Sequence, residues 1–239
     1  LVPGATPIWT PDARFVLFEN TPLGLFAQRV DGASPAEPLV SGAERLIPWS
    51  SHADGTRLAY YAFVDDTGAD IWTVSIAHEN GTLRAGQPEI FRRTKAYETY
   101  PTFSPDGRWL AYGSNESGSW EVYVRSFPDD GNQVRVSTRG GRVPAWSGTA
   151  PGVFYETNDH RLMVASYRVK NGAIEIDPPR SWSERQLADT IVLPAFDLAA
   201  DGRSVVALLP YDEHEVARAD HVTVIVNFLD QLRRIAPAN

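Results

Sequence analysis

Short apolar runs separated by polar turns recur along the whole chain. Between Tyr100 and Pro128 the runs PTF, WLAYG and WEVYVRSF are separated by SPDG and SNESGS. Apolar and polar residues alternate with a period of two in WEVYVRSF and in DIWTVSI, which is typical of β-strands with two distinct faces. The pattern therefore predicts many short strands joined by tight turns.

The same unit of strands and turns occurs five times. Each copy begins with a short strand that carries an aromatic residue, and these aromatics are Trp9, Trp49, Phe103, Trp146 and Phe196. Successive aromatics are 40 to 54 residues apart, a spacing that a repeat of four short strands with loop insertions produces. We expect these aromatic side chains to pack between neighbouring repeats.

A polar turn follows the first strand of most copies. It ends in Asp-Gly at 54–55, 106–107 and 201–202, where glycine supplies the positive φ of a tight reversal. The aspartates, with Asp12 in the first copy, are expected to accept hydrogen bonds from their own turn. Ala13 replaces the glycine in the first copy and SGTAPG replaces SPDG in the fourth, which puts the geometry of these two turns, but not the fold, in question.

The repeats predict one all-β domain over residues 1–239, a β-propeller of four-stranded antiparallel blades. Radial packing buries both faces of such sheets and leaves only short edges. In the last copy the third strand is expected at His221–Phe228, and no fourth follows. Six blades result if upstream residues complete the ring, which we favour; five result if Leu1-Val2 and preceding residues supply the outer strand. The tail NFLDQLRRIAP predicts a short C-terminal helix.

Two segments carry a resemblance to a known family. They are NESGSWEVYVRSFPDDGNQVRVSTRGGRVPAWS, which follows an SPDG turn, and HVTVIVNFLDQLRRIAP. They resemble the TolB-like propeller region that lies C-terminal to the kinase domain in bacterial membrane-bound serine/threonine protein kinases. The resemblance implies a location outside the cytoplasm, in the periplasm or at the outer face of the inner membrane, and a chain that is the C-terminal part of a longer protein. No kinase motif occurs in these residues.

Charge and composition exclude several classes of partner. The net charge is −8 and the pI is near 5.1, which argues against nucleic acid or an anionic membrane surface as the main partner. No run approaches the roughly 20 apolar residues of a membrane span, so this segment is not expected to insert into a membrane. The absence of cysteine excludes disulfides, thiolate metal sites and a cysteine nucleophile.

Catalytic and metal-binding patterns are weak. No serine lies on a G-x-S-x-G elbow, and the five histidines show no metal-ligand spacing. We therefore expect no cofactor, with a structural cation such as calcium as the alternative at the acidic loop Tyr211–His221, Asp65-Asp66 or Asp129-Asp130. An enzyme of the glycosidase, lyase or lactonase type would need inward carboxylates or a metal in the central channel.

Binding residues are expected in the loops that lead into the first strand of each copy. These loops converge at one mouth of a propeller, on a rigid scaffold. The candidates, chosen as residue types common at binding hot spots or able to pair with a basic group, are Arg45, Tyr97, Glu98, Tyr100 and Arg142. The sequence thus favours a non-catalytic module that binds a protein or peptide, as a sensor, a docking module or an accessory subunit of a membrane-associated complex. A free edge strand could also take a partner strand.

Overall fold

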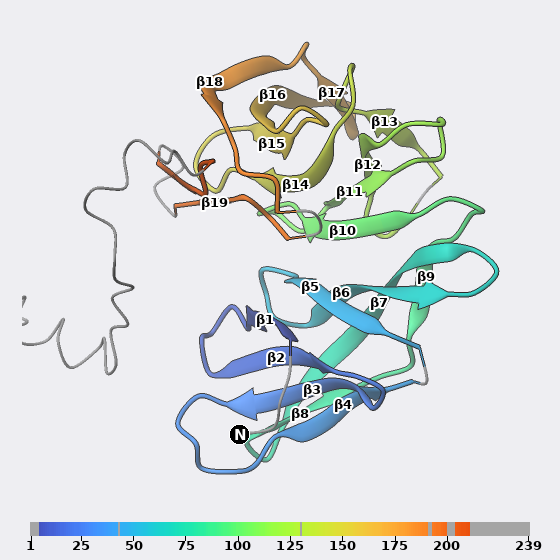
Figure 1. Cartoon of the computed structure of the whole chain (residues 1–239). Helices are drawn as coiled ribbons and strands as arrows, with labels where there is room; N and C mark the ends of the chain where they lie inside the picture. The colour runs from blue at the N-terminus through green and yellow to red at the C-terminus, as the bar shows by residue number, and fades with distance from the viewer. Residues whose placement is uncertain (1–4, 43, 130, 191–192, 200–203, 211–239) are drawn as a thin grey trace, which may run out of the picture. The chain divides into compact units, whose positions relative to one another are not determined.

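The structure is a computed structural model that describes residues 5–42, 44–129, 131–190, 193–199 and 204–210 (Figure 1). These residues form β-strands and turns, and none of them is helical, which confirms the all-β prediction. No helix in these ranges could cross a membrane. Every described strand belongs to one compact unit, Leu1–Leu209. The predicted tail helix, the strand 221–228, the acidic loop 211–221 and the Asp-Gly turn at 201–202 lie outside the described residues.

Four sheets follow one another along the chain, and each contains antiparallel strands paired in chain order. Sheet 1 contains β1 (Ala5–Trp9), β2 (Phe15–Asn20), β3 (Gly24–Arg29) and β4 (Glu37–Ser41). Sheet 3 contains β10 (Glu98–Phe103), β11 (Trp109–Ser114), β12 (Glu121–Ser126) and β13 (Gln133–Arg135). The predicted unit of four short strands is thereby confirmed.

Sheets 2 and 4 contain the insertions that lengthen their repeats. Sheet 2 contains β5 (Leu46–Ser51), β6 (Arg57–Val64), β7 (Gly68–Glu79), β8 (Thr82–Ala85) and β9 (Glu89–Arg92). Sheet 4 contains β14 (Arg142–Trp146), β15 (Gly152–Glu156), β16 (Arg161–Lys170), β17 (Ala173–Ile176) and β18 (Arg180–Gln186). The long strands β7 and β16 each pair with two later strands. A final pair, β19 (Phe196–Leu198) and β20 (Val205–Ala207), begins the fifth copy.

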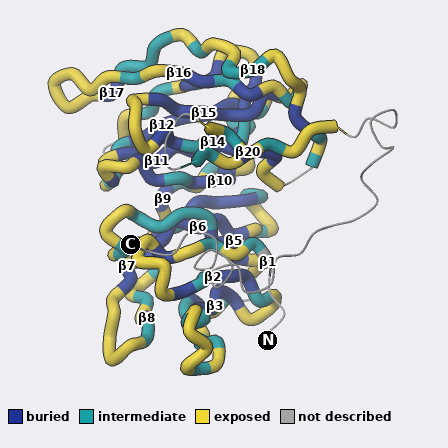
Figure 2. Tube along the Cα trace, turned by 90° about the vertical axis from the view of Figure 1, so that its left-hand side faces the viewer, coloured by how far each residue is buried: buried dark blue, intermediate teal, exposed yellow. Residues whose placement is uncertain are grey.

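Hydrophobic clusters join each sheet to the next. Leu17 and Leu25 of sheet 1 pack with Leu58 and Val74 of sheet 2, and two further clusters connect sheets 2, 3 and 4 and the final pair. Figure 2 shows buried residues along the strands and exposed residues at the outer hairpins. Strands covered on both faces bury successive residues rather than alternate ones, as β11 and β12 do.

The first strand of sheets 1, 3 and 4 carries a β-bulge at the same place. One extra residue enters β1, β10 and β14, and the residue before the proline adopts a positive φ of 49° to 58°, at Thr6, Tyr100 and Val143. In β5 the equivalent position is Pro48, whose ring fixes φ near −65°, and the register shift instead falls between Pro48 and Ser50.

The pairing of the first strand with the second corrects the sequence alignment of the repeat aromatics. Counting from the turn, Trp9, Phe103 and Trp146 occupy one structural position, whereas Trp49 and Phe196 lie two residues earlier in their strands. The aromatic residues are therefore not all equivalent, although each belongs to the first strand of its copy.

Burial of these aromatics follows the packing between sheets. Phe103, Trp146 and Phe196 are buried, as predicted. The indole Nε1 of Trp146 donates a hydrogen bond of 2.9 Å to the carbonyl of Thr102 in the preceding sheet. Trp9 is 60% exposed, contrary to the prediction, because no sheet precedes sheet 1 in the described part of the chain.

The turns after the first strands are built as predicted. The carboxylate of each turn aspartate accepts a hydrogen bond from the backbone N–H two residues later, at Asp12, Asp54 and Asp106. Ala13 adopts φ of +55°, close to the +74° of Gly55 and the +69° of Gly107. Ala13 therefore adopts the same turn geometry as the glycines, which settles the question that the sequence left open for this copy.

Candidate functional site

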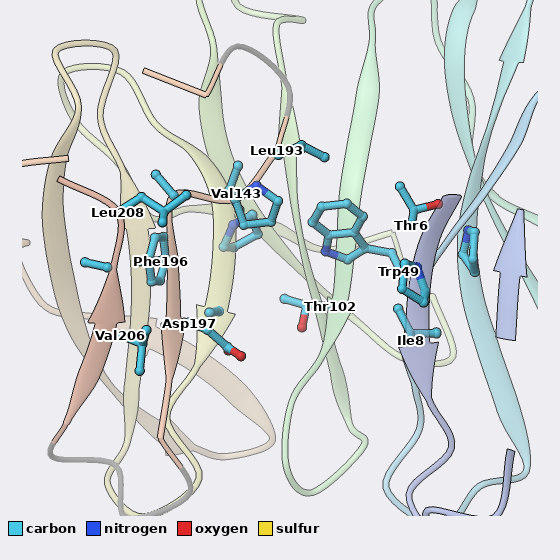
Figure 3. A pocket seen from close by; sticks show the side chains of 17 residues that line it. Thr6, Ile8, Trp49, Thr102, Val143, Leu193, Phe196, Asp197, Val206 and Leu208 are labelled. Carbon is cyan, nitrogen blue, oxygen red and sulfur yellow. The ribbon is translucent and has the colours of Figure 1, made fainter. Parts of the chain in front are cut away.

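The first strands of all five copies line a common cavity of about 620 Å³ (Figure 3). Most of its lining is apolar and comes from proline, aliphatic and aromatic side chains, among them Ile8, Trp49, Val143, Leu193, Phe196 and Leu208. The ring of Trp49 is held in place by Tyr100 and Tyr61, with ring centroids 4.8 and 5.9 Å away. The cavity is of the size and composition of a binding pocket.

Three side chains with hydroxyl or carboxyl groups belong to the described lining of this cavity, Thr6, Thr102 and Asp197. Asp197 is the single carboxylate among these lining residues, and no histidine, lysine or arginine joins it there. Glycosidase chemistry requires two facing carboxyl groups, and the described lining does not provide that pair. Within the described ranges no group of three His, Asp or Glu side chains could hold a metal ion.

Arg45, one of the predicted binding residues, connects sheets 1 and 2 where β5 begins. Its Nε lies 2.8 Å from the Oε1 of Glu19, whose side chain is almost fully buried, while the Arg45 side chain is 53% exposed. The guanidinium also lies 5.7 Å from the centre of the Phe63 ring. The Arg45 side chain is thus held in place by Glu19 and still exposed to solvent.

Tyr97 and Glu98 stand next to each other at the start of β10 but differ in exposure. Tyr97 is 44% exposed and its ring lies over Gly68, where an added Cβ would come within 3.1 Å of it. Glu98 is fully buried and accepts hydrogen bonds from the hydroxyl and backbone N–H of Thr94. Burial raises the pKa of the Glu98 carboxyl, and the bonds from Thr94 oppose that rise.

Tyr100 and Arg142 are the remaining predicted residues. Tyr100 contacts Trp49 of the cavity lining, and Arg142 belongs to an ion-pair group with Glu156 and His160. Tyr100 is buried beneath Trp49, and burial raises the pKa of its hydroxyl. An Arg142 Nη lies 3.6 Å from the Oε1 of Glu156, which also lies 2.6 Å from the Nδ1 of His160. The His160 Nε2 is 3.8 Å from Asp189 in the next loop.

The predicted residues therefore divide into two groups. Arg45, Tyr97 and partly Arg142 reach solvent, whereas Glu98 and Tyr100 are buried and support their neighbours. Their role as one binding patch stays a prediction. Nothing in the local sequence distinguishes Asp197, or the pair of Glu156 and His160, from ordinary turn and strand residues, so these candidates emerge only from the structure.

Comparisons with solved structures identify the class of fold. No protein family and no curated protein matches the sequence. The structure is similar to that of TolB from Acinetobacter baumannii, with a TM-score of 0.57 and 17% identity over 85% of this chain and 53% of the TolB chain. A putative 6-phosphogluconolactonase from Bacteroides uniformis has a TM-score of 0.52 and 16% identity over 82% of this chain and 61% of the lactonase.

An oligogalacturonate lyase in complex with manganese is similar at a TM-score of 0.52 and 10% identity, over 73% of this chain and 53% of the lyase. The fold is thus that of a β-propeller with four-stranded antiparallel blades. The fold resembles that of TolB, and this chain spans about half the length of the TolB chain. Because a lactonase and a lyase share the architecture, the likeness defines the fold and not the activity.

Proposed function

We propose that this chain is a non-catalytic β-propeller that binds a protein or peptide partner at the cavity and the adjoining mouth. The observation that supports the proposal most directly is the described lining of the cavity, whose side chains are apolar apart from Asp197 and the two threonines. Such a lining favours burial of apolar side chains over glycosidase chemistry, which needs two well-placed carboxyl groups.

Recognition would use a surface that is formed before the partner arrives. Trp49 is fixed between rings on neighbouring sheets, so little conformational entropy is lost when a ligand contacts it. Full burial of one leucine or phenylalanine side chain of a partner contributes about 1.5–3 kcal/mol. Arg45 and Tyr97, exposed where β5 and β10 begin, would supply polar contacts at the rim.

The setting of this binding module is also a proposal. The TolB-like fold and the sequence resemblance to propeller regions of membrane-bound kinases support a sensor or docking module outside the cytoplasm, or an accessory subunit of a membrane-associated complex. The acidic net charge of −8 agrees with a protein or peptide partner better than with nucleic acid.

An array of blocked random decapeptides tests the proposal. We expect the wild-type chain to retain a subset of peptides with apolar side chains. Trp49→Ala removes a cavity wall and Ala145→Phe fills the cavity, so both should lose that subset. Trp9→Ala is the matched control, because Trp9 is an exposed tryptophan outside this cavity.

Each variant is first compared with wild type by circular dichroism and thermal unfolding, so that loss of fold is separated from loss of binding. A wild-type chain that retains no peptide above background would refute the proposal. Turnover of a lactone or an oligogalacturonate by the purified chain, abolished by Asp197→Asn, would instead favour the enzyme alternative.

A further inference from the structure

Asp197 is the single charged residue in the described lining of the cavity. It lies in β19 opposite Val206, and its Oδ1 accepts a hydrogen bond of 2.8 Å from the backbone N–H of Leu198. Figure 3 shows the carboxylate projecting into the space between β19 and Thr102 of β10. No arginine, lysine or histidine in the described residues forms a salt bridge with it.

The surroundings of Asp197 strengthen its preference for a cation. The neighbouring lining is apolar, so a ligand that enters displaces water and reduces the screening of the charge. Other polar groups in the lining are hydroxyls, and that of Thr6 is buried without a hydrogen-bond partner among the described residues. The indole face of Trp49 is a further feature that attracts cations.

We propose that the cavity takes a peptide segment in which a lysine or arginine side chain lies beside apolar residues, with the cationic group directed to Asp197. The inference rests on the proposed function and adds the chemistry of the partner to it. The argument for this partner is complementarity. The apolar walls accept the neighbouring apolar side chains of the peptide, and the Asp197 carboxylate favours a cationic side chain over a neutral or acidic one.

Two blocked pentapeptides test this chemistry. One has a central lysine between leucines, and the other has norleucine in place of the lysine. Binding to the full chain is measured by calorimetry at 50 mM and 500 mM NaCl. The variants are Asp197→Asn and the matched control Asp66→Asn, which removes one exposed charge outside the cavity.

We expect the wild-type chain to bind the lysine peptide about tenfold more tightly than the norleucine peptide at low salt, equivalent to about 1.4 kcal/mol. The preference should shrink at high salt, vanish in Asp197→Asn and persist in Asp66→Asn. The norleucine peptide should bind wild type and Asp197→Asn equally, which shows that the variant is folded and that its cavity is intact.

Other results would overturn the inference in distinguishable ways. Equal binding of the two peptides, or a preference that survives in Asp197→Asn, refutes the cationic partner but leaves the peptide-binding function standing. Binding of lysine amide alone, without either peptide, identifies a small cation as the occupant. Reversible self-association that Asp197→Asn abolishes identifies a second copy. Failure of all peptides, including the array, refutes both proposals.

Discussion

Replacing Ala13 by glycine should stabilise this protein. Ala13 has a φ of +55° in the turn between β1 and β2, whereas glycines take the same place in the next two copies. A residue with a Cβ pays about 1–2 kcal/mol in this left-handed region. Glycine avoids that cost but adds about 0.4–1 kcal/mol of chain entropy to the unfolded state. The difference predicts a net gain of about 0.5–1 kcal/mol for Ala13→Gly.

Two glycine variants test the same reasoning in the reverse direction. Gly55→Ala should cost about 0.5–1 kcal/mol, because φ is +74° and an added Cβ has no atom within 4 Å. Gly107→Ala should cost about 1–3 kcal/mol more, because its Cβ would lie 1.8 Å from the Nε2 of His52. His52 would then have to leave its edge contact with the Phe103 ring.

Thermal and urea unfolding measure these differences. For a chain of this length about 1 kcal/mol corresponds to a shift of roughly 2–4 °C in Tm. Ala33→Gly is the control, because Ala33 is exposed and does not have a positive φ, so only the unfolded-state term applies and stability should fall. An Ala13→Gly variant that loses as much stability as Ala33→Gly would show that the positive φ of Ala13 costs no free energy.

Three further predictions concern burial and charge. Trp146→Phe should lower the free energy of unfolding, measured by urea titration, by about 1 kcal/mol, because it removes the hydrogen bond to the Thr102 carbonyl. Trp9→Phe should leave that free energy unchanged, because Trp9 is exposed. Burial raises the pKa of the Glu98 carboxyl above the ordinary 4.5, so the folded state binds the proton more tightly than the unfolded state does. Wild type should therefore lose stability relative to Glu98→Gln as the pH rises. Urea titrations between pH 4 and pH 7 measure this difference. The hydrogen bond from the Thr56 hydroxyl lowers the pKa of the Asp54 carboxyl to about 2, so carboxyl NMR should show Asp54 ionised at pH 3. The stabilisation that this shift provides is present above pH 3.8, the ordinary pKa of the group, and is lost as the pH falls towards 2.

The sequence by itself determined the repeating units of this protein. Period-two alternation marks strands such as β7 and β12, and the aspartates at the turns mark where the first strand of a copy ends. These features depend on residues close together in the chain, as the hydrogen bond that the backbone N–H of Arg108 donates to the Asp106 carboxylate illustrates. Local patterns are therefore sufficient to predict them.

Tertiary structure alone decided the register and the composition of the site. The register shift of β5 falls between Pro48 and Ser50, because Pro48 cannot adopt the positive φ that Tyr100 has at the equivalent position of β10. Similarly, Trp9 and Trp146 begin from the same sequence pattern and differ in burial because only one of them has a described sheet before it.

The cavity has the same origin. Ile8, Trp49, Thr102, Ala145 and Asp197 line it from five copies spread over most of the chain. Each of these residues is an ordinary strand residue in its own segment, so no local pattern distinguishes it. Only the packing of successive sheets brings them together, because long-range contacts, unlike turns and strand periodicity, are not encoded within one repeat.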